Sequence, residues 1–195
     1  MGSLTQLQKS IVIGTILGDD HLRKAKGRND ALLEINHSAK AKDYVDWKYS
    51  ILKNISKSPP KIRENNRLRI AYRFTTCQHK ELTKFYKMFY VGKKKRIPNI
   101  KLDPIMLAVW FMDDGSRCRD RDVYLNTQQF GYSDQMKLVK MLYKIGLRAK
   151  TNKDKVYYRL RFLKADILKL NKLIARYIVP SMRYKLSYDP VETWL

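Results

Sequence analysis

Acidic residues are scarce in this sequence. Its 195 residues include 18 Asp and Glu against 41 Lys and Arg, which gives a formal net charge of +23. An excess of this size is far beyond what solubility requires, so the expected partner is a polyanion. Nucleic acid is the first candidate.

Cysteine and long apolar runs are also scarce. Two cysteines, Cys77 and Cys118, make neither a disulfide framework nor a zinc site, which favours a reducing intracellular setting. No apolar run approaches the ~20 residues that cross a bilayer, and we recognise no signal peptide. We therefore expect no membrane partner. An organelle (mitochondrion or chloroplast) and a microbial cytoplasm are both open as the compartment.

The sequence does contain a continuous apolar segment, LAVWFMDDG, at residues 107–115. Its side chains leave almost no polar face, which predicts a helix inside a domain, and this helix runs into Asp113, Asp114 and Gly115. The helix dipole disfavours carboxylates at the C-terminal end by up to about 1 kcal/mol, so we expect a cation to compensate them. Magnesium is the simplest choice, because it takes oxygen ligands and needs only one or two carboxylates.

A second copy of this pattern, IVIGTILGDDHL, lies at residues 11–22, and aligning the two copies pairs Asp19 with Asp114. Both copies resemble the signature of the LAGLIDADG homing endonucleases, the second more closely. The likeness extends over nearly the whole chain. One departure concerns Asp20, which stands where the family usually has glycine.

The resemblance implies a monomeric α+β protein made of two pseudo-symmetric αββαββα halves. The halves, residues 1–92 and 104–195 with a linker at 93–103, would pack through the two LAGLIDADG helices, and their antiparallel sheets would form a DNA-binding saddle. The periodicity of the sequence agrees with this order. It predicts helices at 4–17, 40–55, 79–90, 133–145 and 164–178, and hairpins around 27–30 and 116–128.

Two predicted strands, residues 67–75 and 155–162, alternate apolar and mostly cationic residues, as a sheet with one packed face and one charged face requires. Aligning Arg73 with Arg161 gives nearly the same interval as the two aspartates, which favours a duplication. This alignment matches Phe74 with Phe162. The residues predicted to face inward are Leu68, Ile70, Tyr72 and Phe74, and Val156, Tyr158, Leu160 and Phe162.

The cationic strand faces are the expected DNA-reading surface. Arginine and lysine on a sheet in the major groove reach guanine, and asparagine reaches adenine, although some contacts would involve phosphate only. The first choices are Arg67, Arg69, Arg73, Arg159 and Arg161, with Lys155 on the same face. The second choices are Lys24, Arg28, Asn36, Arg117, Arg119, Arg121 and Asn126.

Four further catalytic candidates follow from the resemblance. Lys95 and Lys185 match the basic residue that comes after the last helix of each half, and it would hold water or stabilise charge on phosphate. His37 and Gln128 match the positions of a polar side chain that orients water. A solvated surface side chain is the open alternative for each of the four.

The resemblance implies a site-specific double-strand DNA endonuclease that hydrolyses one phosphodiester in each strand. Asp19 and Asp114 would be catalytic and hold Mg²⁺, with Mn²⁺ or Ca²⁺ able to occupy the same site. The alternative is an RNA-binding intron maturase, with intron RNA as its partner, or a DNA-binding relative that has lost catalysis. Charge and basic strands suit both readings; the two acidic helix ends favour the nuclease, and Asp20 favours the alternative.

Overall fold

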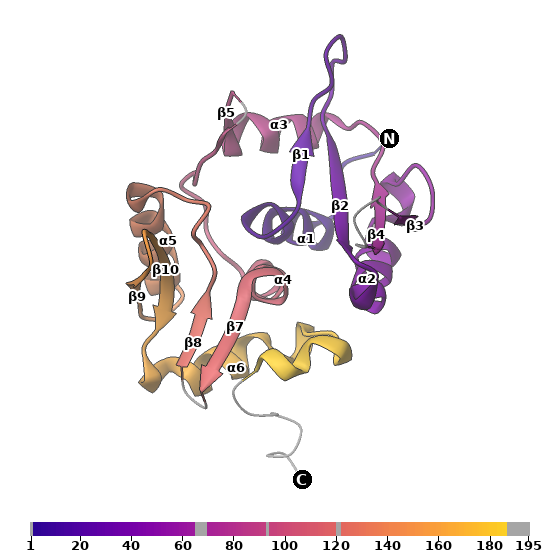
Figure 1. Ribbon diagram of the computed structural model, residues 1–195. Helices are drawn as coiled ribbons and strands as arrows, with labels where there is room; N and C mark the ends of the chain where they lie inside the picture. The colour runs from indigo at the N-terminus through magenta and orange to yellow at the C-terminus, as the bar shows by residue number, and fades with distance from the viewer. Residues whose placement is uncertain (1, 65–69, 93, 120–121, 187–195) are drawn as a thin grey trace. The chain divides into compact units, whose positions relative to one another are not determined.

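The computed structural model describes residues 2–64, 70–92, 94–119 and 122–186. The chain divides into two compact units, Met1–Met88 and Phe89–Leu195, and each unit has its own four-stranded antiparallel sheet (Figure 1). Within the described ranges, no helix is long and apolar enough to cross a membrane. The α+β class predicted from the sequence is confirmed.

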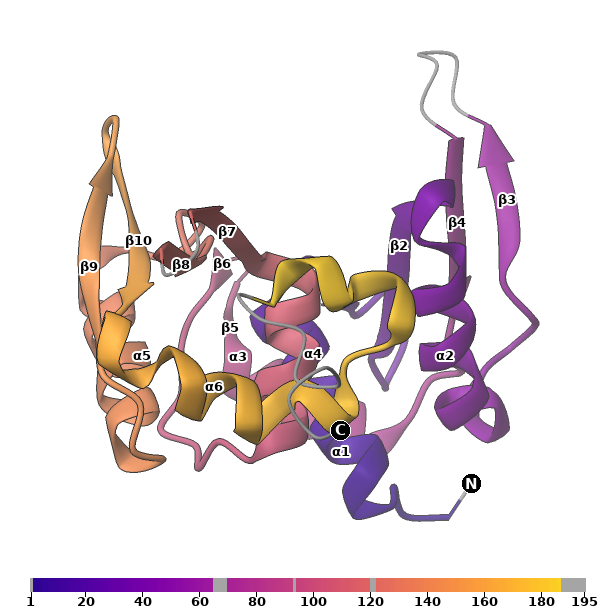
Figure 2. The same ribbon diagram turned by 90° about the horizontal axis from the view of Figure 1, so that it is seen from below.

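The first unit follows the predicted order αββαββα. Its sheet has the strand order β1-β2-β4-β3, and α2 lies along β2 and β4 on one face (Figure 2). The elements are α1 (Gln6–Leu17), β1 (His21–Arg23), β2 (Leu32–Ser38), α2 (Lys42–Leu52), β3 (Lys61–Glu64), β4 (Ile70–Thr75) and α3 (Lys80–Phe89).

The second unit repeats this order after a short hairpin, which occupies a stretch predicted as a basic turn and linker. Its main sheet has the order β7-β8-β10-β9, the same arrangement as in the first unit. The hairpin consists of β5 (Tyr90–Val91) and β6 (Lys94–Lys95). The other elements are α4 (Pro104–Asp114), β7 (Gly115–Arg119), β8 (Asp122–Leu125), α5 (Tyr132–Lys144), β9 (Ala149–Asp154), β10 (Tyr157–Phe162) and α6 (Ile167–Ile174), followed by 3-10 turns at Ala175–Tyr177 and Pro180–Lys185.

Both motif helices are interior, as their sequences predicted. Residues 10–17 of α1 and 106–112 of α4 are all buried. A polar side chain begins each helix: the Thr5 hydroxyl accepts the Gln8 N–H at 3.2 Å, and the Asp103 carboxylate accepts the Met106 N–H at 2.8 Å. These caps satisfy N–H groups that the first turn of a helix leaves unpaired.

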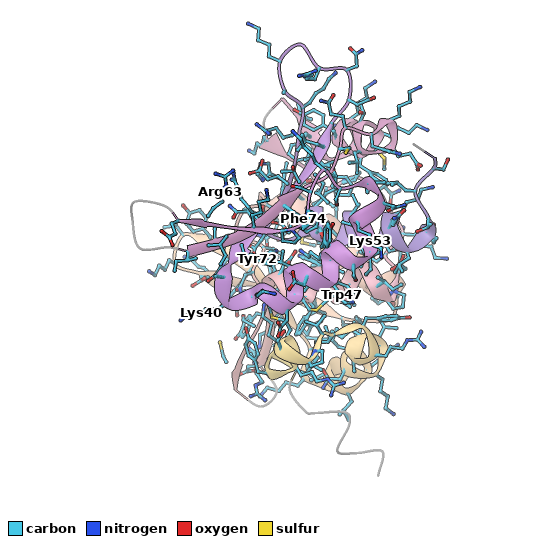
Figure 3. The ribbon with its side chains drawn as sticks, turned by 90° about the vertical axis from the view of Figure 1, so that its right-hand side faces the viewer. Lys40, Trp47, Lys53, Arg63, Tyr72 and Phe74 are labelled. Carbon is cyan, nitrogen blue, oxygen red and sulfur yellow. The ribbon has the colours of Figure 1, made fainter. Side chains whose placement is uncertain are left out.

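In the first sheet, the face toward α2 is apolar and the other face is open. Phe74 is 3% exposed and meets Tyr49 of α2 edge-on, with ring centroids 5.4 Å apart. Figure 3 shows Tyr72 and Phe74 on the side of β4 that faces α2, and Arg63 on the opposite side. Ile70 was predicted to face inward, and this is wrong. It is 47% exposed, because it lies at the end of a ribbon formed with β3, whose residues are all exposed.

In the second sheet, Leu160 and Phe162 are buried, as predicted. The start of the predicted strand is wrong: Val156 lies in a turn and is 79% exposed. Tyr158 is 38% exposed, but its ring meets that of Tyr132 of α5 edge-on with centroids 5.7 Å apart, so it faces the helix as predicted. Lys155 lies in the turn between β9 and β10 with a φ of 54°, in the left-handed region that a residue with a side chain uncommonly adopts. The chain reverses at Lys155, so this residue and Val156 have no packed sheet face beside them.

The strand ladders give the internal alignment of the two sheets. Phe74 lies opposite Ile35 in the first sheet, and Leu160 lies opposite Leu125 in the second. In the pairing between the first two strands of each unit, Ile35 and Leu125 occupy equivalent positions when Asp19 is aligned with Asp114. Phe74 therefore corresponds to Leu160. The sequence alignment, which matched Phe74 with Phe162, was displaced by two residues.

Candidate active site and nucleic-acid interface

Asp114, the last residue of α4, is buried in the second unit. The residue is 6% exposed, and Trp110, one turn earlier, donates its indole N–H to Oδ2 at 3.2 Å. Its peptide carbonyl accepts the Asn126 N–H at 2.9 Å, which joins the end of the helix to the chain after β8. Gly115 follows because a Cβ at this position would lie 2.3 Å from the carbonyl oxygen of Phe111. The local backbone thus requires the glycine of the second motif.

Lys185 lies at the same end of α4. Its ammonium donates to the carbonyl oxygens of Met112 and Asp113, the latter at 3.1 Å. A cation at this position opposes the negative end of the helix dipole. The second unit therefore brings together two of the predicted catalytic residues, Lys185 and Asp114, at one helix end.

The first motif ends differently. α1 stops at Leu17 with Gly18 as its C-cap, so Asp19 is an exposed residue in the turn that follows. The helix predicted at residues 4–17 thus ends at Leu17 as expected, two residues before Asp19, whereas α4 includes Asp114 as its last residue. Glycine is a poor helix former, which is consistent with an end at residue 18.

Asp20, the residue in place of the motif glycine, lies in a buried ionic cluster. Its Oδ2 is 2.9 Å from Lys48 Nζ and 2.9 Å from His37 Nε2, and its Oδ1 accepts the Asn36 N–H at 2.8 Å. Asp20 is 2% exposed and Lys48 is 0% exposed. Burial by itself would raise the pKa of Asp20, but the charge of Lys48 and the hydrogen bonds from His37 and Asn36 hold this pKa below its usual value. The carboxylate is therefore ionised.

Sequence reasoning missed Lys48. It lies on the buried row Tyr44, Lys48 and Leu52 of α2, and its ammonium is 4.4 Å from the centre of the Tyr44 ring. Helical periodicity put Tyr44, Trp47, Ile51 and Ile55 on one face of this segment; Tyr44 and Ile55 are buried, whereas Trp47 and Ile51 are half-buried. A lysine within an otherwise apolar row is the signal that could have identified a buried ion pair.

Two other catalytic candidates are Lys95, on a strand, and Gln128, in the turn after β8. Lys95 is half-buried in β6. Gln128 donates from Nε2 to Asp154 Oδ2 at 2.9 Å. In the aligned ladders, Thr127 rather than Gln128 takes the place of His37, and Thr127 is buried.

The open face of the first sheet is basic. Asn36 and Arg73, both predicted to read DNA, lie opposite each other, and Arg73 also lies opposite Lys61 of β3. Like charges directly opposite each other destabilise a ladder, and Glu34, 3.7 Å from Arg73, offsets them in part. The basic residues of this face that the sequence analysis missed are Arg23, Lys61 and Arg63.

Several predicted DNA-binding residues lie elsewhere. Lys24 and Arg28 are exposed in the loop between β1 and β2. The structure does not describe Arg67, Arg69, Arg121 or the side chain of Arg119. Leu68, which was predicted to face inward, also lies outside the described residues.

In the second sheet, Tyr124 organises the open face. The guanidinium of Arg159 lies 4.1 Å from the centre of its ring, and that of Arg161 lies 5.9 Å away. Arg161 forms an ion pair with Asp122. Among the described residues, no group hydrogen-bonds the buried Nε of Arg159. One predicted arginine is thus neutralised by a carboxylate, and the other is stacked on an aromatic ring.

Two further predicted residues are placed apart from this stack. Arg117 lies opposite the buried Val123, and hence on the side of the ladder away from Arg159. Asn126 follows β8 and is half-buried.

Comparison with known families tests the resemblance inferred from the two motifs. The sequence model of the LAGLIDADG DNA endonuclease family matches residues 9–170, which include both motifs. This chain belongs to that family. The LAGLIDADG resemblance inferred from the sequence is thereby confirmed, and so is the αββαββα order expected for each half.

Individual relatives agree with the LAGLIDADG assignment. The Probable intron-encoded endonuclease 1 of Wickerhamomyces canadensis is 30% identical over 205 residues, which cover 96% of this chain and 87% of that protein. The Cytochrome b mRNA maturase bI2 of Saccharomyces cerevisiae is 27% identical over 207 residues, which cover 96% of this chain and 49% of the maturase. This chain therefore spans about half the length of that relative.

The solved structure of a homing endonuclease has a similar fold. The homing endonuclease I-WcaI bound to its DNA recognition sequence is 29% identical, with a TM-score of 0.88 over 95% of this chain and 88% of that one. I-DmoI in complex with DNA and Ca has a TM-score of 0.56 at 16% identity over 88% of this chain and 91% of that one, which indicates the shared fold alone.

Proposed function

We propose that this chain is a site-specific endonuclease that hydrolyses one phosphodiester in each strand of a DNA duplex. The observation that carries the proposal is the carboxylate retained at both motifs, Asp19 directly after α1 and Asp114 at the end of α4. Membership of the LAGLIDADG DNA endonuclease family supports it. So do the intron-encoded endonuclease relative and the likeness to I-WcaI bound to its DNA recognition sequence.

Asp19 and Asp114 are the residues that would hold a divalent metal. Hard cations such as Mg²⁺, Mn²⁺ and Ca²⁺ take oxygen ligands, so two carboxylates fit the group. A carboxylate has lone pairs for a metal besides the one that accepts the indole N–H of Trp110. When bound, the ion would neutralise charge on the phosphate and lower the pKa of a water. We propose Mg²⁺ as the cofactor, with Mn²⁺ or Ca²⁺ as substitutes.

The chain's own side chains would do the rest. Lys185, at the end of α4, places an ammonium beside the last turn of the second motif, where it would stabilise negative charge that develops on phosphate. We propose the same role for Lys95, which follows the last helix of the first half. His37 and Gln128 would orient water.

The open sheet faces would bind the duplex. Arg73 and Asn36 in the first unit and Arg159 in the second are side chains on open faces that can reach base edges. Each half supplies a motif helix, a carboxylate and a basic sheet, so we expect one chain to act as a monomer inside the cell. We retain residues 1–92 and 104–195, joined by 93–103, as the two halves.

The test is a cleavage assay with a randomised duplex library and Mg²⁺, in which all newly formed ends are sequenced. We expect ends clustered at one site. Asp19→Asn and Asp114→Asn should abolish cutting and preserve binding to that site. Undiminished cutting by either variant, or complete loss of binding, would contradict the assignment.

A second candidate is an RNA-binding maturase. It is favoured by the relatives named cytochrome b mRNA maturase and by Asp20 in place of the motif glycine. Binding to a structured intron RNA, with no new ends from the duplex library, would favour this candidate over the endonuclease.

A further inference from the structure

The buried cluster of Asp20, His37 and Lys48 has a cost in stability. Lys48 is 0% exposed and Asp20 is 2% exposed, and removing two charges from water costs several kcal/mol per ion before their attraction offsets it. Buried ion pairs are often no more stabilising than apolar residues of similar volume. A function for the cluster is therefore worth seeking.

The second half provides an internal comparison. Gly115 takes the place of Asp20 directly after the motif, and Thr127 takes the place of His37 in the aligned strands. α2 begins at Lys42 and α5 begins at Tyr132, so the buried residue at the place of Lys48 is Leu138. The same fold is thus built in the second half with Gly115, Thr127 and Leu138, and it does not require the ions.

The contacts of Asp20 connect three segments of the first unit. Oδ1 holds the Asn36 N–H at 2.8 Å, and Oδ2 holds His37 Nε2 at 2.9 Å, so one carboxylate fixes both the backbone and the ring at the end of β2. Asp19 is the preceding residue, so its backbone is held as well. Lys48 Nζ lies 2.9 Å from Oδ2, so it places a positive charge beside the buried carboxylate.

We propose that Lys48 is a positioning residue for the first half of the nuclease site. It acts on His37 directly, with Nζ 3.2 Å from Nε2, and through Asp20 on both His37 and the backbone of Asp19. The proposal rests on the endonuclease function proposed above. Its consequence is that the two halves are chemically unequal, with a fixed imidazole in the first half where the second has the hydroxyl of Thr127. The two DNA strands should therefore be cut at different rates, and the faster cut should depend on Lys48.

The first experiment measures thermal unfolding and needs no catalysis. Lys48→Leu alone leaves Asp20 buried without its cation and should lower Tm by about 10 °C. The triple variant Asp20→Gly, His37→Thr and Lys48→Leu installs the second half's residues, and its Tm should return to within a few degrees of the wild type. A triple variant as unstable as Lys48→Leu would contradict the internal comparison on which the inference depends.

The second experiment follows each strand separately. A duplex obtained from the library assay carries a different fluorophore on each strand, and both cleavage rates are measured with Mg²⁺. We expect the triple variant to cut the strand that the wild type cuts faster at least tenfold more slowly than the wild type does, and the other strand within about twofold of the wild-type rate. A role in stability alone would slow both strands equally, and that result would overturn the proposal.

A double variant, Asp20→Gly with Lys48→Leu, separates positioning from the imidazole itself, because His37 is kept but loses its contacts with Asp20 and Lys48. It should behave as the triple variant does; a wild-type rate on both strands would overturn the positioning role. Lys53→Leu is the matched control, since it removes an equal charge from an exposed residue directly after α2 and should change neither rate (Figure 3). If the folded wild type binds duplexes and cuts neither strand, the endonuclease proposal fails and this inference fails with it.

Discussion

The two arginines that flank Tyr124 should contribute unequally to DNA binding. The guanidinium of Arg159 lies 4.1 Å from the ring centre, and among the described residues its Nε has no hydrogen-bond partner. Arg161 forms an ion pair with Asp122 on the same face. Arg159 is thus oriented by a neutral ring and keeps its full charge for a polyanion, whereas the charge of Arg161 is already compensated.

The magnitude follows from counterion release. Each phosphate that a cation neutralises adds about 0.9 to the slope of log K against log salt for duplex DNA. Arg159→Gln should therefore lower the slope by about 0.9, and by less if Arg159 contacts a base instead. The double variant Asp122→Asn with Arg161→Gln exchanges a compensated pair for two neutral amides, so its slope should stay within about 0.3 of the wild type.

The assay is fluorescence anisotropy of a labelled random-sequence duplex without divalent metal, so that cutting does not interfere, from about 50 to about 200 mM salt. Asp122→Asn alone should steepen the slope, because it releases the charge of Arg161. If the double variant loses as much slope as Arg159→Gln, or if Asp122→Asn changes nothing, then Arg161 carries the contact and the reasoning from the ion pair is refuted.

Three further changes test other parts of the molecule. Lys185→Met should lower the cleavage rate by about 10² or more with little change in binding, as expected when a preorganised donor is lost, and single-turnover kinetics would measure it. Gly115→Ala should destabilise the fold by about 1–3 kcal/mol in denaturant unfolding, because the new Cβ would lie 2.3 Å from the Phe111 carbonyl oxygen. The hydrogen bond from Arg148 lowers the pKa of Asp166 to about 2, so this carboxylate stabilises the fold above its unfolded pKa near 4 and loses that effect as pH falls toward 2. Asp166→Asn should remove this acid-dependent part of a pH titration of stability.

Periodicity was sufficient for the order of the elements and for the two interior helices. The all-apolar run of α4 has no polar face to expose, so its burial follows from the residues alone. Periodicity was a poorer guide to which side chains of a strand are buried. Ile70 alternates correctly with its neighbours, yet it is exposed, because it lies at the end of a ribbon formed with β3, whose residues are all exposed. How far a helix covers a sheet is a tertiary property, which alternation cannot report.

Register was the other limit. The alignment of Phe74 with Phe162 rested on residue type, and phenylalanine is a good choice for either of two inward positions in the same strand. The strand pairing identifies Leu160 as the counterpart of Phe74, because Leu160 lies opposite Leu125 as Phe74 lies opposite Ile35. A shift of two residues keeps every side chain on its face, so the inward and outward pattern gave no warning of it.

The ionic cluster shows why a duplicated architecture does not fix the chemistry of its two halves. Asp20 in place of glycine was visible in the sequence and suggested an unwanted carboxylate near the metal-binding residues. The structure gives that carboxylate a partner on a different element, Lys48, at 2.9 Å. Neither residue alone predicts the other, because a buried lysine is tolerable only where a carboxylate meets it, and that meeting depends on how α2 packs on β2. The second half has the same packing with Gly115 and Leu138, so this place in the fold accepts either ions or apolar contacts. Of the two halves, the first has the ions, and they hold an imidazole beside its motif.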